Sequence, residues 1–154
     1  MKLTVLAVGR LARSPEVELV KLYVERATAA GRALGLGPVE VVEVEARKPG
    51  KAAEAEVLRG HLTDAHIIAC DERGTARSSR DFATEIGRLR DQGVRRLVFL
   101  IGGADGLEPA MAASAQGRLA FGPQTWPHAL ARAMLAEQIY RAVTILAGGP
   151  YHRD

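Results

Sequence analysis

The stretch that decides the fold is the last quarter of the chain, GPQTWPHALARAMLAEQIYRAVTILAGGPYHRD, residues 122–154. Its opening loop is stiff, because Pro123 and Pro127 fix their own φ and keep the preceding residue out of the helical region. Residues 128–147 then form a predicted helix that is apolar around most of its circumference. Such a helix needs cover on two or more sides, which we expect from its own sheet and from another subunit. Its narrow polar stripe consists of Arg132, Glu137, Gln138, Arg141 and Thr144.

A short tail follows the helix after a break at Gly148-Gly149-Pro150. The tail reads Tyr151-His152-Arg153-Asp154 and is dense in groups that stack, titrate and bind anions. Most chain ends fray and carry no such concentration of groups. We therefore favour a functional tail over a frayed end.

Upstream of this stretch, short apolar strands alternate with helices. Strands that are apolar on both faces are typical of a mostly parallel sheet with helices on both sides. The sequence thus predicts an α/β fold with a sheet of five to six strands, and the absence of linkers or repeats predicts one domain over residues 1–154. The expected strands are residues 2–8, 39–44, 66–71, 95–101 and 118–121, and the expected intervening helices are residues 15–34, 52–62, 80–92 and 108–116.

The composition predicts a cytoplasmic protein without metal or membrane. A chain of 154 residues is long enough to bury roughly 70% of its unfolded surface. The single cysteine, Cys70, excludes an internal disulfide and a cysteine-based zinc site, and no two of the four histidines have the spacing of metal ligands. No apolar run is long enough to cross a membrane. The net charge of +3 permits a polyanionic partner without requiring one.

Three loops are candidates for a ligand site, because ligands of open α/β sheets bind beyond the carboxyl ends of the strands. They are residues 71–79, 102–106 and 122–127. Glycines at positions 102, 103 and 106 allow close approach of a ligand to the backbone, but their spacing matches neither a dinucleotide fingerprint nor a Walker loop. By itself, such a turn is more often only a tight turn than a ligand site.

Several side chains have simple structural interpretations. Cys70 lies inside an apolar strand and is expected to pack rather than to react. Glu137 and Arg141 are four residues apart on one helix, so they are expected to form an ion pair. His128, at the start of the last helix, is more often a residue that hydrogen-bonds the preceding loop than a catalytic group.

Four segments, in order, carry a resemblance that covers essentially the whole chain. They are LIGGADGL (100–107), WPH (126–128), EQIYRA (137–142) and PYHR (150–153). Together they resemble the ribosomal large-subunit methyltransferase H family, which belongs to the SPOUT, or α/β-knot, methyltransferases. Each segment alone is weak, but their combination and order are specific.

The resemblance implies a function beyond what the periodicity shows. The implied reaction is N3-methylation of pseudouridine 1915 in 23S rRNA of the assembled ribosome, with S-adenosyl-L-methionine as the methyl donor. The implied fold includes a C-terminal trefoil knot, although the general rule disfavours knots, and a homodimer packed through the knot helices. Cys70 stands where leucine is usual in the family, and Trp126 where phenylalanine or leucine is usual. The residues implied to bind the donor are Cys70, Gly103, Gly122, Pro123, Gln124, Thr125, Trp126 and Pro127.

The tail carries our catalytic hypothesis. Tyr151 positions or stacks on the base, Arg153 contacts a base carbonyl or a phosphate and favours the imide anion, and His152 assists deprotonation or orients the tail. His128 and Arg132 are expected to hold the tail or the RNA. The tail is expected to fold back over a pocket formed by the three loops.

RNA binding is expected to rest on arginines near the strand ends and to weaken as salt rises. Two rival functions remain open: a SPOUT relative that methylates tRNA, and a ribosome-associated binding protein without catalysis. The arginines are Arg10, Arg13, Arg73 and Arg77.

Overall fold

One parallel sheet contains all five strands of the described chain. The computed structural model describes residues 1–153. The strand order is β2-β1-β4-β3-β5, and each described pair of neighbouring strands is parallel. This confirms the predicted α/β class and narrows the sheet to five strands. The strands are β1 (Lys2–Val8), β2 (Val39–Val44), β3 (His66–Ala76), β4 (Arg96–Ile101) and β5 (Gly117–Ala120).

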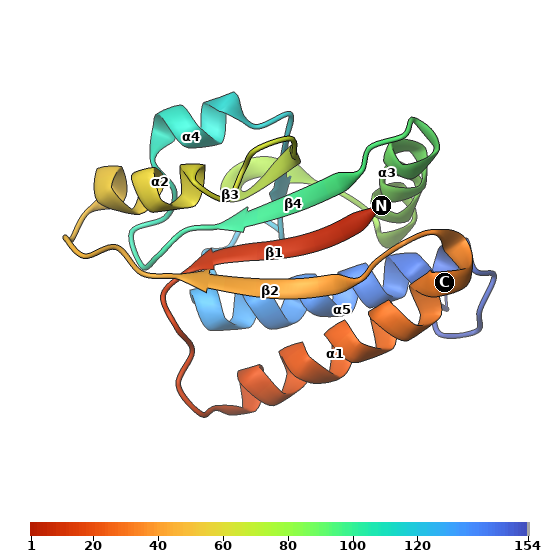
Figure 1. The fold of residues 1–154 in the computed structure, drawn as a ribbon. Coiled ribbons are helices and arrows are strands. Elements are labelled where there is room, and N and C mark those ends of the chain that lie inside the picture. Colours follow the sequence, from red (N-terminus) through yellow and green to blue (C-terminus); the bar gives the residue numbers. More distant parts are fainter. Residues whose placement is uncertain (154) are drawn as a thin grey trace.

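Helices cover both faces of the sheet (Figure 1). α1, α3 and α5 lie on one face, where α5 packs against both α1 and α3, and α2 and α4 lie on the other. No helix within residues 1–153 has the length and apolar character needed to cross a membrane. The helices are α1 (Pro15–Gly31), α2 (Lys51–Arg59), α3 (Ser79–Asp91), α4 (Pro109–Ser114) and α5 (His128–Leu146), with a 3₁₀ turn at Arg32–Leu34.

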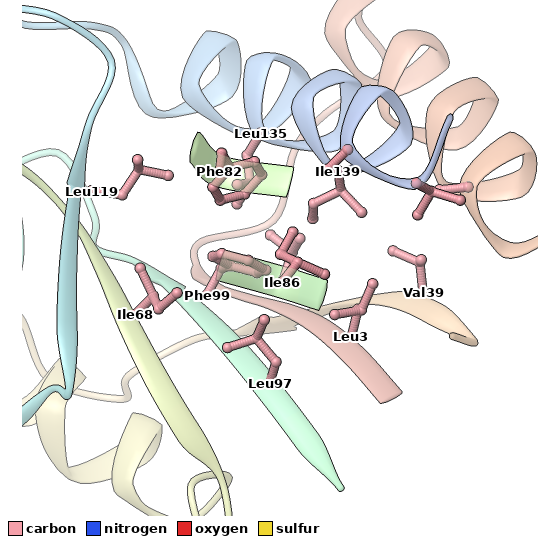
Figure 2. Close-up of a cluster of buried hydrophobic side chains, with 14 of the residues drawn as sticks. Leu3, Val39, Ile68, Phe82, Ile86, Leu97, Phe99, Leu119, Leu135 and Ile139 are labelled. Carbon is pink, nitrogen blue, oxygen red and sulfur yellow. The ribbon is translucent and has the colours of Figure 1, made fainter. Parts of the chain in front are cut away.

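Two hydrophobic cores form because successive side chains of a strand point to opposite faces of the sheet. Leu3 of β1 and Phe99 of β4 face α3 and α5, where Figure 2 shows them with Ile86 and Leu135. Side chains of the other parity face the opposite way: Leu6 and Leu100 belong to the core under α2 and α4. Strands buried on both faces explain the continuous apolar runs in the sequence.

Two helices begin after a serine, but only one of these serines forms a capping hydrogen bond. The Ser78 side chain accepts a hydrogen bond from the backbone N–H of Asp81 at 3.1 Å, so Ser78 caps α3. Ser14 occupies the N-cap position of α1, and Pro15 fills its first turn, but the Ser14 side chain makes no capping bond. The first turn of α1 therefore relies on the fixed φ of proline rather than on a side-chain cap.

β3 differs most from the prediction. The sequence predicts a loop from residue 72 onward, but β3 continues to Ala76 through an irregularity between Cys70 and Thr75. Thr75 and Ala76 pair with Leu119 and Ala120 of β5. Gly74 makes this possible, because a Cβ atom there would lie 2.7 Å from the backbone carbon of Leu119. The loop after β3 is therefore shorter than predicted and is anchored to β5.

Candidate functional site

A cleft of about 810 Å³ opens beyond the carboxyl ends of β3, β4 and β5. Its volume lies within the range of roughly 300–1,000 Å³ that is usual for small-molecule sites. The three predicted loops all contribute to it, and Lys51 and Arg118 border it as well. The contributing segments are Cys70–Arg73, Ile101–Leu107, Leu119–Phe121 and Gln124–His128.

The loop after β4 needs glycine for close packing. Gly106 has a φ of +79° and donates its N–H to the Gly103 carbonyl at 3.0 Å, which closes a tight turn. A Cβ atom on Gly102 would lie 2.5 Å from the Gly106 carbonyl carbon. A Cβ atom on Gly103 would lie 2.8 Å from Oε1 of Glu54, a residue of α2. Any side chain at Gly103 must therefore displace the Glu54 carboxylate at the edge of the cleft.

Specific hydrogen bonds shape the loop after β5. Gly122 turns the chain with a φ of +103°. Thr125 donates its hydroxyl to Glu72 Oε2 at 3.0 Å, and the Trp126 indole N–H donates to the Phe121 carbonyl at 3.2 Å. These bonds tie the loop to the extended part of β3 and to the end of β5. Gln124 to Pro127 line the cleft, whereas Gly122 lines a separate groove described below.

Cys70 provides a neutral wall to the cleft. Burial raises the pKa of its thiol to about 12. A thiolate is the reactive form of cysteine, and this environment disfavours it. The side chain thus packs as a small apolar group, as the sequence indicates.

Arg132, on the predicted polar stripe of α5, is buried inside the protein. Its side chain is fully enclosed, donates to Glu43 Oε1 at 2.8 Å and to the Gly9 carbonyl at 2.8 Å, and also reaches the Val8 carbonyl. Desolvation lowers the pKa of Arg132, and the Glu43 carboxylate opposes that shift. A contact between Arg132 and RNA would require the buried guanidinium to leave these partners. His128, by contrast, is half-buried and lines the cleft.

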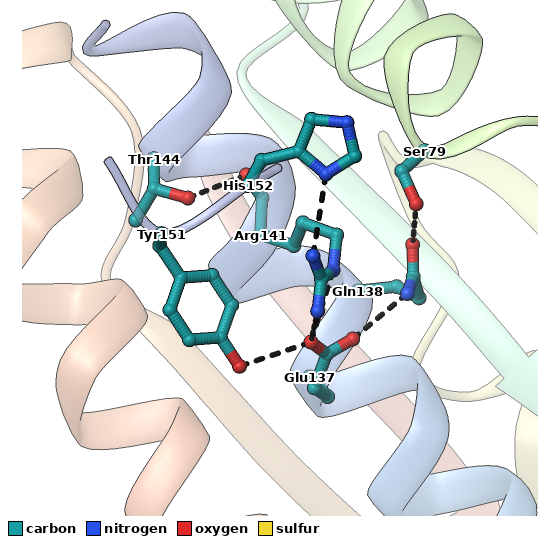
Figure 3. Close-up of polar contacts among 7 residues, drawn as sticks. All are labelled: Ser79, Glu137, Gln138, Arg141, Thr144, Tyr151 and His152. Carbon is teal, nitrogen blue, oxygen red and sulfur yellow. Dashed lines mark hydrogen bonds and ion pairs between the residues drawn. The ribbon is translucent and has the colours of Figure 1, made fainter. Parts of the chain in front are cut away.

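The tail lies on the polar stripe of α5 (Figure 3). Tyr151 donates its hydroxyl to Glu137 Oε1 at 3.0 Å. Arg141 donates through Nε to the same oxygen at 3.0 Å, which confirms the predicted ion pair. The Arg141 guanidinium also lies 4.8 Å from the centre of the Tyr151 ring, and its Nη1 lies 3.2 Å from Nδ1 of His152. The tail is therefore docked at defined contacts.

The docked tail and the cleft occupy different parts of α5. The cleft reaches His128 and Ala131, whereas the tail contacts Glu137 and Arg141. Ten residues of helix separate Ala131 from Arg141, which corresponds to about 15 Å along the axis. Residues 151–153 do not line the cleft of their own chain, so the expectation that the tail closes over the pocket is wrong for a single chain.

Comparison with known proteins shows the family. A family model described as a predicted SPOUT methyltransferase matches residues 1–152. The chain belongs to the SPOUT methyltransferases. Relatives named ribosomal RNA large subunit methyltransferase H, from Phenylobacterium zucineum (strain HLK1) and Caulobacter sp. (strain K31), are 83% and 71% identical over 154 residues, the full length of both chains in each comparison. The resemblance seen in the sequence is confirmed.

A solved structure with a similar fold supports the architecture alone. The crystal structure of a probable methyltransferase from Bordetella pertussis Tohama I aligns with a TM-score of 0.53 at 17% identity, covering 92% of this chain and 96% of the other. At this identity the match concerns the fold and not the substrate. It agrees with a parallel sheet that carries helices on both faces.

The SPOUT chain also has a groove of about 590 Å³ along α5, bordered by α1 and by the start of α3 and the end of β5. Leu19 and Leu130 line it with 41% and 37% of their surface exposed. Glu137 lies at the same groove, next to the docked tail. No group of three or more His, Cys, Asp or Glu side chains in residues 1–153 could hold a metal ion.

Sequence reasoning missed two features of the SPOUT site. Glu54 of α2 faces the Gly103 loop, but nothing in the spacing of α2 marks it. Glu137 and Arg141 were predicted only as an ion pair, yet they also hold the tail. The contacts between the tail and Glu137 or Arg141 could have been inferred from the many polar groups in EQIYRA and PYHR. These two polar segments lie close together at the end of an otherwise apolar helix, so their side chains are the nearest hydrogen-bond partners for one another.

Proposed function

We propose that this chain transfers the methyl group of S-adenosyl-L-methionine to N3 of a pseudouridine in 23S rRNA of the assembled ribosome. The observation that carries the proposal is the 83% identity, over the full length of both chains, to the relative named ribosomal RNA large subunit methyltransferase H. The matched length includes the glycine loop, the loop after β5 and the tail. A ribosomal substrate implies a cytoplasmic location.

The cleft has the chemistry that a nucleoside sulfonium requires. It offers apolar walls at Cys70 and Leu119 and half-buried backbone at Gly103. Three carboxylates and three cations also line it, so the sulfonium would need to lie on the side of the carboxylates. The carboxylates are Asp71, Glu72 and Asp105, and the cations are Lys51, Arg73 and Arg118. The residues proposed to hold the donor are Cys70, Gly103 and Gln124 to Pro127, with Gly122 and Pro123 shaping the turn that leads to them. When bound, the donor supplies an electrophilic methyl group and leaves as neutral S-adenosylhomocysteine after the N3 electron pair forms the new bond.

The residues of this chain must position an imide nitrogen that has lost its proton. Holding two reactants in the right geometry lowers a barrier by roughly 7–11 kcal/mol in well-oriented systems. We propose that Tyr151, whose ring packs against Tyr140 and Arg141, positions the base, and that the Arg153 cation contacts a base carbonyl or a phosphate. The negative charge of the imide anion lies on the two carbonyl oxygens that flank N3, so donors at those oxygens favour the reaction.

A homodimer would bring a tail to each cleft. In a dimer with two-fold symmetry, each copy would contribute the same groove to the interface. If the two α5 helices ran antiparallel and crossed near Met134, residue 130 of one helix would lie opposite residue 138 of the other. Each tail, docked at Glu137 and Arg141 of its own chain, would then lie near the first turn of the partner α5, which borders the cleft. The exposed leucines of the groove, Leu19 and Leu130, would be buried in the pair.

The C-terminal segment is also proposed to form a knot. β5 leads through residues 121–127 into α5, which returns across the sheet to lie beside α1 (Figure 1). A knot requires that the returning chain pass through a loop. We propose, on the family resemblance alone, that it does, and that residues 1–154 form one domain.

A methyl-transfer assay tests the proposed function. The protein is incubated with radiolabelled S-adenosyl-L-methionine and with ribosomes that lack the modification, isolated 23S rRNA, or bulk tRNA. Label is expected in the 23S rRNA of ribosomes only. Label in tRNA would support the rival SPOUT activity, and absence of both label and donor-binding heat would support a non-catalytic ribosome-binding protein.

A further inference from the structure

The tail histidine is held by a group that can only donate hydrogen bonds. Arg141 Nη1 lies 3.2 Å from His152 Nδ1, and a guanidinium has no acceptor (Figure 3). Nδ1 must therefore accept, and the hydrogen of the neutral imidazole must lie on Nε2. We infer that Arg141 fixes His152 as the Nε2-protonated tautomer, so that His152 acts on the RNA as a hydrogen-bond donor and not as the base that removes the N3 proton.

Arg141 keeps this orientation because other groups hold it. Its Nε donates to Glu137 Oε1 at 3.0 Å, and its Nη2 donates to the same oxygen. Its guanidinium also lies over the Tyr151 ring. The hydrogen bond to Glu137 is the main cause of a raised pKa for Arg141, so the guanidinium stays charged. If Nδ1 of His152 carried a hydrogen, two hydrogen-bond donors would point at each other, because Arg141 Nη1 is held in place and can only donate.

Glu137 is fixed in turn by its neighbours. Gln138 Nε2 donates to Glu137 Oε2 at 2.8 Å, and Ser79 of α3 donates to Gln138 Oε1 at 2.8 Å. A chain of hydrogen bonds therefore runs from α3 through Glu137 and Arg141 to His152, as Figure 3 shows. Such a chain makes Arg141 a positioning residue for His152.

Tyr151 is also excluded as the base. Its hydroxyl donates to Glu137 Oε1 at 3.0 Å. Burial first, and then Tyr23 and Glu137, raise the pKa of the Tyr151 phenol above its ordinary value, so it stays protonated. If the chain has the proposed function, we expect His152 and Arg153 to donate to the carbonyl oxygens that flank N3, and the N3 proton to pass to water.

The tautomer is measured directly on the free full-length protein. Long-range ¹H–¹⁵N correlation spectra of ¹⁵N-histidine-labelled protein at pH 8 separate the two neutral tautomers and the imidazolium, and a His152→Gln variant assigns the His152 signals. We expect His152 to show hydrogen on Nε2. A wild-type His152 with hydrogen on Nδ1, or an even mixture, would overturn the inference without any further variant.

Variants then test whether Arg141 is the cause. In Arg141→Met the His152 pattern is expected to shift towards a mixture of tautomers. Arg59→Met is the control, because it also breaks an arginine–glutamate pair but at α2. In this variant the His152 pattern is expected to stay as in the wild type. An unchanged His152 pattern in a folded Arg141→Met protein would refute the assignment to Arg141.

Methylation of ribosomes separates the donor role from a base role. Two substitutions of the tail histidine are compared: His152→Gln keeps an N–H donor, whereas His152→Ala removes it. We expect His152→Gln to retain at least about 10-fold more activity than His152→Ala, a difference of about 1.4 kcal/mol. Equal losses would contradict the donor role. A wild-type protein with the expected tautomer but without methylation would instead defeat the proposed function and leave the tautomer intact.

Discussion

At the scale of single residues, Gly103 gives a test of the cleft, because it lines the cleft and its nearest neighbour is the movable carboxylate of Glu54. A Cβ atom on Gly103 would lie 2.8 Å from Glu54 Oε1 and 3.1 Å from Oε2. Gly103→Val is therefore expected to push the Glu54 carboxylate aside, to fill the edge of the cleft, and to lower the affinity for S-adenosyl-L-methionine at least about 10-fold, or about 1.4 kcal/mol. Titration calorimetry measures this affinity.

Gly60 provides the matched control for Gly103→Val. Gly60 ends α2 with a φ of −60°, and a Cβ atom there would lie 3.5 Å from the nearest backbone oxygen, an ordinary contact. Gly60→Val is expected to leave donor affinity unchanged. If Gly103→Val bound the donor as tightly as Gly60→Val does, the glycine loop would not be the donor site.

Cys70 gives a second test at this scale. A thiol with a pKa of about 12 is ionised in only about one molecule in 10⁴ at pH 8, and only the thiolate alkylates rapidly. Iodoacetamide is expected to label folded Cys70 far more slowly than it labels the urea-unfolded protein, with the folded rate still rising between pH 8 and pH 10. Mass spectrometry follows the labelling. Labelling at the unfolded rate would show that the thiol is not held neutral.

At the scale of secondary-structure elements, Arg132 joins α5 to the ends of β1 and β2. Its guanidinium is enclosed and binds Glu43 together with the carbonyls of Val8 and Gly9. Arg132→Leu leaves the Val8 and Gly9 carbonyls without this donor, whereas the exposed Glu43 carboxylate can turn to water. A buried acceptor left without its donor costs about 1–3 kcal/mol, so a loss of at least about 1 kcal/mol is expected. Urea denaturation is expected to show that loss of stability.

The surface arginine Arg88 serves as the control for Arg132→Leu. Arg88 donates to Gln92 on the exposed side of α3. Arg88→Leu is expected to change the free energy of unfolding by less than about 0.5 kcal/mol. A similarly small change in Arg132→Leu would mean that the packing of α5 on the sheet does not depend on the buried Arg132 guanidinium.

Element order was predictable from the sequence because it depends on local signals. The apolar run of β4, the proline at the start of α1 and the serine before α3 each act on neighbouring residues. The extension of β3 to Ala76 and the burial of Arg132 were not predictable, because each depends on a partner far along the chain. Gly74 approaches Leu119, and Arg132 reaches Glu43, so neither contact leaves a local pattern.

The candidate site, too, was predictable only where it depends on local signals. The three cleft loops were predicted, because parallel strands place their carboxyl ends at one edge of a sheet. The position of the tail was not, because it depends on contacts with Glu137 and Arg141 that a pattern of spacing shows only as an ion pair.

At the scale of the whole molecule, we propose that two chains associate through the groove that α5 forms with α1, α3 and β5. Leu130 is 37% exposed in this groove. Leu130→Asp places a charge where a partner would bury apolar surface, so it is expected to convert a dimer into a monomer in sedimentation velocity. Ala110→Asp, on exposed α4 at the other face of the sheet, is the control and is expected to remain dimeric. A monomeric wild-type protein would contradict the proposed dimer.

Separation of the tail from its own cleft leads to a complementation experiment. One chain carries Gly103→Val and keeps an intact tail, and the other keeps an intact cleft but carries alanine substitutions of Tyr151, His152 and Arg153. Each is expected to be inactive on ribosomes alone. About half of randomly mixed dimers contain one chain of each kind. If each tail acts on the partner's cleft, such a dimer has one working site of two, so the mixture is expected to recover about a quarter of wild-type activity. If the tail acts on its own cleft, no chain has both parts and the mixture stays inactive, which would refute a shared site while leaving the methyltransferase fold untouched.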